Sequence, residues 1–300
     1  MSAVYRRCLI LGWALWGVVA CHPEVCPTKP YQAPEMLLRA HRSMRRPITS
    51  LRAEARIEQK GPRGRGRADA FLFVRRPESV RIDLMSPFGP LATLTSDGRQ
   101  FALFDRRRSA FSEGPSCPSN IARLLGVGLS GREVVDMLLA EPLRLKGQAV
   151  LAHCGPFAYR VQRESEDGRR VELDFSIRRR DRDAPWSQQY LRLRRAAGFA
   201  ATGQALWRLS YDDYRVVPDP RGPKRGGRRL GVAMPFQVRY ADLRRGITLA
   251  LTFRSMSLNV EVPARAFVQS APPGVRRRRM QCLPGERLMP RRSSARVEAR

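Results

Sequence analysis

Lysine and histidine are scarce in this chain, and the motifs of common active sites are missing. Only four of the 56 basic residues are lysine, and His22, His41 and His153 lack the spacing of metal ligands. There is no Gly-x-Ser-x-Gly elbow and no His-Glu-x-x-His pair. The acids Asp212 and Asp213 are adjacent, so on a strand they would point to opposite faces. We therefore expect no metal, no cofactor and no enzymatic activity.

Long apolar runs are also missing, except near the N-terminus. A short basic segment precedes the apolar run 8–19, which has the length of a signal-peptide core and is too short to cross a bilayer comfortably. The run leads into Ala20-Cys21, which resembles a bacterial lipobox. We expect residues 1–20 to be a lipoprotein signal peptide and Cys21 to carry acyl chains such as palmitate, which anchor the protein. An ordinary signal peptide with a chance cysteine is the alternative.

Acidic residues are few, 27 against 56 basic ones, and the formal net charge is +29. A basic surface favours anionic partners such as lipid headgroups or nucleic acid. The arginine runs are not interleaved with aromatic residues as in a nucleic-acid platform, and export also argues against nucleic acid. We interpret these runs as a solvated rim, with contact to anionic headgroups as the functional alternative. The runs are Arg106–Arg108, Arg178–Arg180 and Arg276–Arg279.

Apolar and polar residues alternate over residues 71–111, with turn signals about every ten residues. This pattern predicts a meandering antiparallel sheet with one wet face. The same alternation occurs at 51–58 and returns after residue 157, so the chain contains two halves of a sheet. A short amphipathic helix is expected to start at Pro34 and to end before Pro47.

A helical pair is expected between the two halves of the sheet. Residues 118–125 have helical character and are followed by Gly126, and Ser130 with Glu133 fits a capping box that starts a second helix. Gly126 also begins a Gly-x-Gly-x-x-Gly pattern. We interpret this pattern as a linker between the two helices, because a dinucleotide site needs a preceding strand.

The rest of the chain divides by composition. Prolines recur in residues 21–33, which we expect to form a lipidated tether, whereas residues 34–274 form one domain. Residues 275–300 are basic and contain proline, and we expect a disordered tail. Once Cys8 and Cys21 are set aside, four cysteines remain, which allow three pairings. Of these we favour Cys117 with Cys154, which would bracket the helical pair; free thiols are the alternative.

One aromatic residue is expected at a loop tip. Phe88 lies in Ser86-Pro87-Phe88-Gly89-Pro90, which interrupts two strand-like runs. An aromatic side chain at such a tip either folds back onto the domain or projects as an apolar probe that touches a membrane or an acyl chain. The residues leave both interpretations open.

Several weak motifs follow one another along the chain. They are Arg-Arg-Pro-Glu-Ser-Val-Arg at 75–81, Ser86-Pro87-Phe88-Gly89, Leu-Thr-Ser-Asp-Gly at 94–98, Trp207-x-Leu209-x-Tyr211-x-x-Tyr214, Met234-Pro235, and Phe267 before Pro272-Pro273-Gly274. In this order, from about residue 35 to 274, they resemble the LolB-like outer-membrane lipoproteins of the LolA/LolB lipoprotein-localisation fold, together with related uncharacterised lipoproteins.

The resemblance implies a mainly β fold with an α lid. It would be a half-open, strongly curved antiparallel sheet of about 11 strands, with helices across its concave face and an apolar cavity that accepts lipoprotein acyl chains. The resemblance also implies a loop whose exposed apolar residue faces the membrane, and Phe88 occupies the matching loop, where an aliphatic residue is more usual. The candidate cavity residues are Ile82, Leu84, Leu94, Phe101, Leu103, Leu125, Val135 and Leu138.

These expectations combine into one functional hypothesis. The chain would be a monomeric outer-membrane lipoprotein that faces the periplasm, binds acyl chains of lipoproteins or lipids and assists their transfer, with a periplasmic lipoprotein carrier as a partner. Each buried CH₂ of an acyl chain contributes about 0.8 kcal/mol, so binding needs no specific polar site. The alternative is a scaffolding lipoprotein that holds a protein or an anionic component of the envelope.

Overall fold

The computed structural model describes residues 26–62, 64–143, 147–155, 158–225 and 227–286. The predicted signal peptide and the lipidated Cys21 lie outside these residues. Among the described helices, none is both long and apolar enough to span a bilayer.

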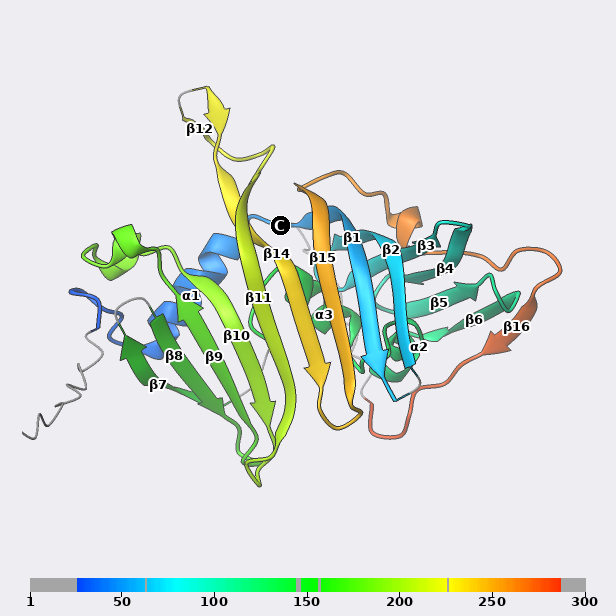
Figure 1. Cartoon of the computed structure of the whole chain (residues 1–300), viewed down its shortest axis with the longest axis horizontal. Helices are drawn as coiled ribbons and strands as arrows, with labels where there is room; N and C mark the ends of the chain where they lie inside the picture. The colour runs from blue at the N-terminus through cyan, green and yellow to red at the C-terminus, as the bar shows by residue number, and fades with distance from the viewer. Residues whose placement is uncertain (1–25, 63, 144–146, 156–157, 226, 287–300) are drawn as a thin grey trace, which may run out of the picture.

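One large sheet dominates the fold and curves without closing (Figure 1). Its strand order is β16-β6-β5-β4-β3-β2-β1-β15-β14-β11-β10-β9-β8-β7. Neighbouring strands are antiparallel, except that β16 runs parallel to β6. The half that ends in β16 contains β1 (Ser50–Gly61), β2 (Gly64–Arg75), β3 (Ser79–Ser86), β4 (Gly89–Ser96), β5 (Gln100–Asp105), β6 (Ala110–Pro115) and β16 (Arg276–Arg279).

The other half of the sheet ends in β7. It contains β7 (Gln148–Gly155), β8 (Ala158–Glu164), β9 (Arg170–Ser176), β10 (Arg192–Phe199), β11 (Ala205–Pro218), β14 (Gly231–Asp242) and β15 (Ile247–Leu258). Outside the sheet lie the hairpin of β12 (Lys224–Arg225) and β13 (Arg228–Arg229) and three 3₁₀ turns, Arg179–Asp181, Trp186–Gln188 and Ala264–Phe267. The half-open sheet predicted from the resemblance is confirmed, with 14 strands rather than about 11.

Three helices lie over one face of the sheet: α1 (Pro34–Arg45), α2 (Pro118–Leu125) and α3 (Gly131–Leu138) (Figure 1). The predicted capping box is present, because the Glu133 amide donates to the Ser130 hydroxyl at 3.2 Å and the Ser130 amide donates to the Glu133 carboxylate at 2.8 Å. Gly126 ends α2 in the left-handed conformation, at φ 74°. The glycine pattern is therefore a linker between α2 and α3, as predicted.

The helices and the inner face of the sheet share one hydrophobic core. Two contacts show how the helices are positioned. The Tyr211 hydroxyl on β11 donates to the Met137 carbonyl in α3 at 3.1 Å, and His41 of α1 packs edge-on against Phe175 of β9, with ring centroids 5.1 Å apart. Burial, and then nearby guanidinium groups, lower the pKa of His41 well below its ordinary value, so its imidazole is neutral in the folded protein.

A largely buried ion pair connects α1, the β2–β3 turn and the segment after α3. The Arg76 guanidinium contacts the Glu141 carboxylate, and the two side chains are 22% and 8% exposed. Arg76 also donates to the Ile48 carbonyl at 2.6 Å and to the Arg45 carbonyl at 3.3 Å. One side chain therefore ties the C-terminal end of α1 to two other parts of the fold.

The predicted disulfide is wrong. The structure pairs Cys26 with Cys154 and Cys117 with Cys282, instead of Cys117 with Cys154. The reason is the strand order: Cys117 follows β6 and Cys154 lies on β7, and these two strands lie at opposite ends of the sheet. Closeness in sequence across the helical pair therefore does not bring the two cysteines together.

The expected disorder of residues 275–300 is also wrong for the part that the structure describes. Arg276–Arg279 form β16 on the outer edge of β6, and Cys282 is tied to Cys117. An unpaired edge of a sheet offers free backbone donors and acceptors, and this segment uses them. Residues 287–300 lie outside the described residues.

Candidate functional site

The eight candidate cavity residues come together, but as part of a packed core. Seven of them are buried and Leu84 is half-buried, and all belong to or pack against the same hydrophobic cluster. They lie on β3, β4, β5, α2 and α3. Leu103 is the member of the set that also lines an open pocket, described next.

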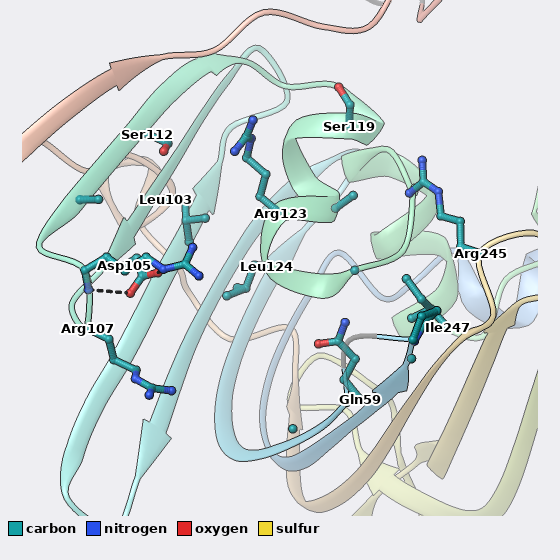
Figure 2. A pocket seen from close by; sticks show the side chains of 18 of the residues that line it. Gln59, Leu103, Asp105, Arg107, Ser112, Ser119, Arg123, Leu124, Arg245 and Ile247 are labelled. Atoms are coloured by element: carbon teal, nitrogen blue, oxygen red, sulfur yellow. Dashed lines mark hydrogen bonds and ion pairs between the residues drawn. The ribbon is translucent and has the colours of Figure 1, made fainter.

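A pocket of about 1300 Å³ lies beside α2, and we name it the α2 pocket (Figure 2). Its walls come from α2, from the tips of the β1–β2 and β14–β15 hairpins, and from β5, β6 and β16. The apolar part of its surface is formed by Pro62, Leu103, Ala110, Ala122, Leu124 and Ile247. Leu124 faces the pocket, whereas the next residue in α2, Leu125, is buried in the core. On the α2 side, this short helix lies between the pocket and the core, whereas Leu103 on β5 belongs to both.

Arginine dominates the charged part of the α2 pocket. Among the described residues, seven arginines line it, against one acid, Asp105. Asp105 lies 3.7 Å from Arg108, and Arg245 lies 3.9 Å from Asp242 outside the pocket. The other five have no ion pair within the described part of the chain; they are Arg65, Arg107, Arg123, Arg276 and Arg278. The pocket is therefore an amphipathic, cationic site in which apolar and polar side chains share the lining.

The sequence analysis missed this set of arginines. They come from β2, the β5–β6 turn, α2, the β14–β15 turn and β16, and the fold alone brings these segments together. Two of the arginine runs contain members of the set, and their sequence favours a solvated rim, with contact to anionic headgroups as the functional alternative. The lining residues that the structure describes include no histidine, cysteine or lysine, and their arginines are suited to binding an anion.

Phe88 is fully exposed at the tip of the β3–β4 hairpin. The Phe88 amide donates to the Ser86 hydroxyl at 3.2 Å, and that hydroxyl donates to the Gly89 carbonyl at 3.0 Å. Gly89 has φ 118°, a conformation that side chains other than glycine rarely adopt. The turn is therefore tightly built and holds the ring away from the domain, so the folded-back interpretation is wrong.

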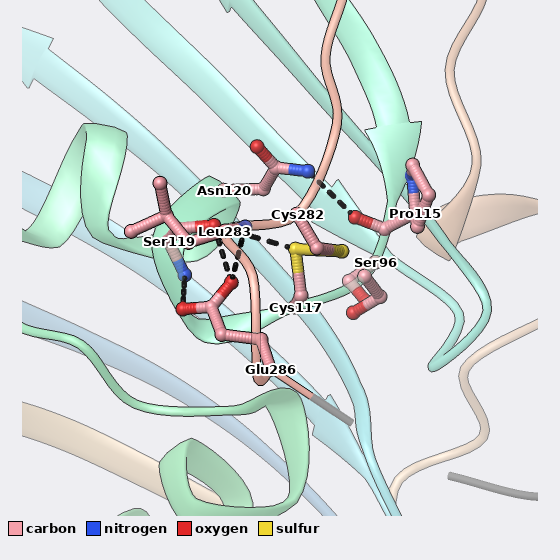
Figure 3. Close-up of a disulfide and its surroundings, with 9 residues drawn as sticks. Ser96, Pro115, Cys117, Ser119, Asn120, Cys282, Leu283 and Glu286 are labelled. Atoms are coloured by element: carbon pink, nitrogen blue, oxygen red, sulfur yellow. Dashed lines mark hydrogen bonds between the residues drawn. A yellow bond between two sulfur atoms is a disulfide. The ribbon is translucent and has the colours of Figure 1, made fainter. Parts of the chain in front are cut away.

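Three potential metal ligands meet near the start of α2 (Figure 3). They are Cys117, Cys282 and Glu286, with ligand atoms within 4.8 Å of one another. Both sulfur atoms are used in the disulfide, and the Glu286 carboxylate accepts from the Ser119 amide at 3.0 Å and from the Ser119 hydroxyl at 2.6 Å. With the disulfide formed, the cluster attaches the C-terminal segment to the start of α2 through a covalent bond and hydrogen bonds.

No protein-family model matches the chain, and no curated protein matches it. Solved structures do. A DUF1329 family protein from Desulfovibrio piger aligns with a TM-score of 0.50 at 11% identity, over 81% of this chain and 99% of that protein. A LolA superfamily protein from Nitrosomonas europaea aligns with a TM-score of 0.49 at 15% identity, over 80% of this chain and 99% of that protein. An outer membrane lipoprotein-sorting protein domain from Vibrio parahaemolyticus aligns with a TM-score of 0.48 at 9% identity, over 77% of this chain and 95% of that domain. The chain is therefore similar in overall fold to the DUF1329 family protein, and at this identity the likeness concerns the fold alone.

Proposed function

We propose that this protein is a lipid-anchored protein of the bacterial envelope that binds an acyl chain of a lipid or lipoprotein in the α2 pocket. The observation that supports the proposal most is the pocket itself, because it combines open volume with an apolar patch on the face of the sheet that carries the helices. Its volume exceeds the ordinary range for small-molecule sites, roughly 300–1,000 Å³. An extended acyl chain needs such a space and no specific polar partner.

Two further observations support a place in the envelope. Both disulfides require an oxidising compartment, and together they pair all four cysteines of the described residues. The Cys26–Cys154 bond also fixes the start of the domain to β7, five residues after the proposed lipidated Cys21. The anchor would thus hold the β7 end of the sheet near the outer membrane, on its periplasmic side. The α2 pocket lies toward the other end of the sheet, where a monomer could receive lipidated cargo from a periplasmic carrier.

Native mass spectrometry of residues 22–300, purified from a lysate that contains membranes, tests the proposal. The described core lies between Tyr31 and Phe267, so residues 22–300 include every residue of it. We expect bound acyl lipid in the wild-type protein and its loss in Leu124→Arg, because the new charge would lie in the apolar patch of the pocket. Leu124 is only half-buried, so the fold should tolerate the change.

Val216→Arg is the matched control, since Val216 is 69% exposed on β11 and is not part of the α2 pocket. It should keep the lipid. If the wild-type protein carries no lipid and also fails to bind a fluorescent fatty acid at micromolar concentration, the carrier proposal is wrong.

We further propose that Phe88 touches the membrane. Burying a phenylalanine side chain is worth about 1.5–3 kcal/mol, so Phe88→Asp should weaken binding to vesicles by roughly tenfold or more. Sedimentation of the protein with vesicles of phosphatidylethanolamine and phosphatidylglycerol measures this. Val268→Asp, at a site that is 56% exposed outside the hairpin, controls for added negative charge. Equal loss in both variants would contradict a special role for Phe88.

A second function, a scaffolding lipoprotein, is favoured by one specific observation. Apart from Leu103, which also lines the α2 pocket, the eight candidate cavity residues form a filled interior rather than an open one. A protein that is isolated free of lipid, together with a stoichiometric protein partner, would support this alternative.

A further inference from the structure

The C-terminal segment forms a wall of the α2 pocket. Successive side chains of a strand point to opposite sides, and in β16 Arg276 and Arg278 line the pocket, whereas Arg277 and Arg279 do not. β16 is fastened at both ends by backbone bonds, from the Arg276 amide to Ser109 at 3.1 Å and from the Met280 amide to Glu113 at 2.7 Å. The two pocket-lining guanidinium groups are thus carried by a positioned strand and not by a free tail.

The Cys117–Cys282 disulfide holds the same segment against the start of α2 (Figure 3). Its Cα atoms are 6.0 Å apart, and the Ser119–Glu286 hydrogen bonds lie next to it. The covalent bond therefore connects the arginine-bearing wall with the helix that supplies Arg123 and Leu124 to the same pocket.

The fold collects positive charge around the pocket from distant parts of the sequence. Arg65, Arg107, Arg123 and Arg245 share the lining with the two arginines of β16. Like charges in one concave site repel one another and raise the local concentration of anions. Asp105, the one acid among the described lining residues, is already close to Arg108. An anion from outside would relieve the repulsion.

We propose that the α2 pocket selects amphiphiles whose headgroup carries a phosphate monoester. The inference rests on the proposed acyl-chain binding and adds a headgroup to it. The guanidinium fork matches phosphate oxygens bidentately, and a phosphate monoester offers several oxygens and close to two negative charges to arginines that approach from different sides. The acyl tail would lie along Leu103, Leu124 and Ile247, and Arg276 and Arg278 would hold the phosphate.

The test uses two fluorescent lipids with the same labelled acyl chain, a lysophosphatidate and a monoacylglycerol, and measures both Kd values by titration with residues 22–300. We expect wild-type protein to bind the lysophosphatidate at least about tenfold more tightly, since each 1.4 kcal/mol of charge-assisted bonding is a factor of ten. This preference should fall as salt is raised, because exposed charges are screened. In Arg276→Gln/Arg278→Gln the ratio of the two Kd values should fall toward one.

Arg277→Gln/Arg279→Gln is the matched control: it removes the same charge from the same strand, on the side away from the pocket. This control should keep the preference for lysophosphatidate. If both double variants lost the preference equally, net charge alone would explain it, and the inference would be overturned. Equal wild-type affinity for the two lipids would overturn the inference and leave acyl-chain binding standing. Binding of neither lipid would overturn the proposed function too. Inorganic phosphate that displaces lysophosphatidate at equal concentration would show a site for the free anion and overturn selection of a lipid.

Discussion

Arg76→Met is expected to lower the free energy of unfolding by about 3 kcal/mol or more, measured by urea denaturation. The substitution keeps most of the side-chain volume but leaves the Glu141 carboxylate, 8% exposed, without its cation. Removing one member of a buried pair typically costs about 3–5 kcal/mol, because the other charge stays desolvated. The bonds from Arg76 to the Ile48 and Arg45 carbonyls are lost as well. Unfolding should remain cooperative, since the segments that Arg76 connects all belong to the same hydrophobic core.

Arg254→Met provides the matched control. Arg254 and Asp69 also form a close pair, at 2.8 Å, but the two side chains are 49% and 45% exposed. Exposed pairs are worth about 0–1 kcal/mol, so the control should lose no more than that. Adding Glu141→Gln to Arg76→Met should restore part of the stability, because it removes the buried charge. Equal losses for Arg76→Met and Arg254→Met would show that burial of the Arg76–Glu141 pair is not what matters.

Local signals predicted the local structure well. The capping box of Ser130 and Glu133 and the glycine after Leu125 specify the ends of helices through bonds between near neighbours in sequence, and both are present. The alternation over residues 71–111 correctly predicted a meander, because the side-chain period of a strand is a property of the strand itself. Phe88 could be placed at a loop tip because the prolines and the glycine beside it indicate a turn.

Features that depend on strand order could not be predicted. The pairing of Cys117 with Cys282 follows from β16 lying next to β6, and nothing in the Arg276–Arg279 run marks it as a strand. Four arginines in a row lack apolar alternation, and order there comes from the free edge of β6 together with the covalent bond. That the arginines of the α2 pocket lie close together could not be predicted either. Each of them lies in a segment whose own sequence is typical of a solvent-exposed surface, and only the strand order brings these segments together.

The candidate cavity residues show a second limit of prediction from the sequence. Alternation identifies the inward face of a strand, and Ile82, Leu94 and Phe101 are inward as expected. Periodicity does not distinguish a side chain that lines a cavity from one that packs in a core. That difference depends on how far the helices fill the concave face, and here α2 and α3 fill the part above β3, β4 and β5. The open volume lies beside α2 instead.

Removing the Cys117–Cys282 disulfide, by Cys117→Ala/Cys282→Ala, is expected to cost about 4 kcal/mol of global stability. A cross-link stabilises mainly by restricting the unfolded chain, more so for long loops, and this one joins residues 165 apart. The bond also has a local effect. All four residues of β16 are exposed on an edge strand, so without the bond the segment is held by a few backbone hydrogen bonds to β6 and by the Ser119–Glu286 hydrogen bonds. Hydrogen exchange at the Arg276 and Met280 amides should therefore become much faster.

Cys26→Ala/Cys154→Ala separates the two effects. Its loop, with a separation of 128 residues, should cost a similar amount of global stability in the unfolding experiment. This bond lies at the β7 end of the sheet, so the slow exchange of the Arg276 and Met280 amides should persist. If the α2 pocket needs β16 in place, the preference for lysophosphatidate should be lost in the first double variant and kept in the second. Equal loss in both would mean that general stability, and not the position of Arg276 and Arg278, determines headgroup selection.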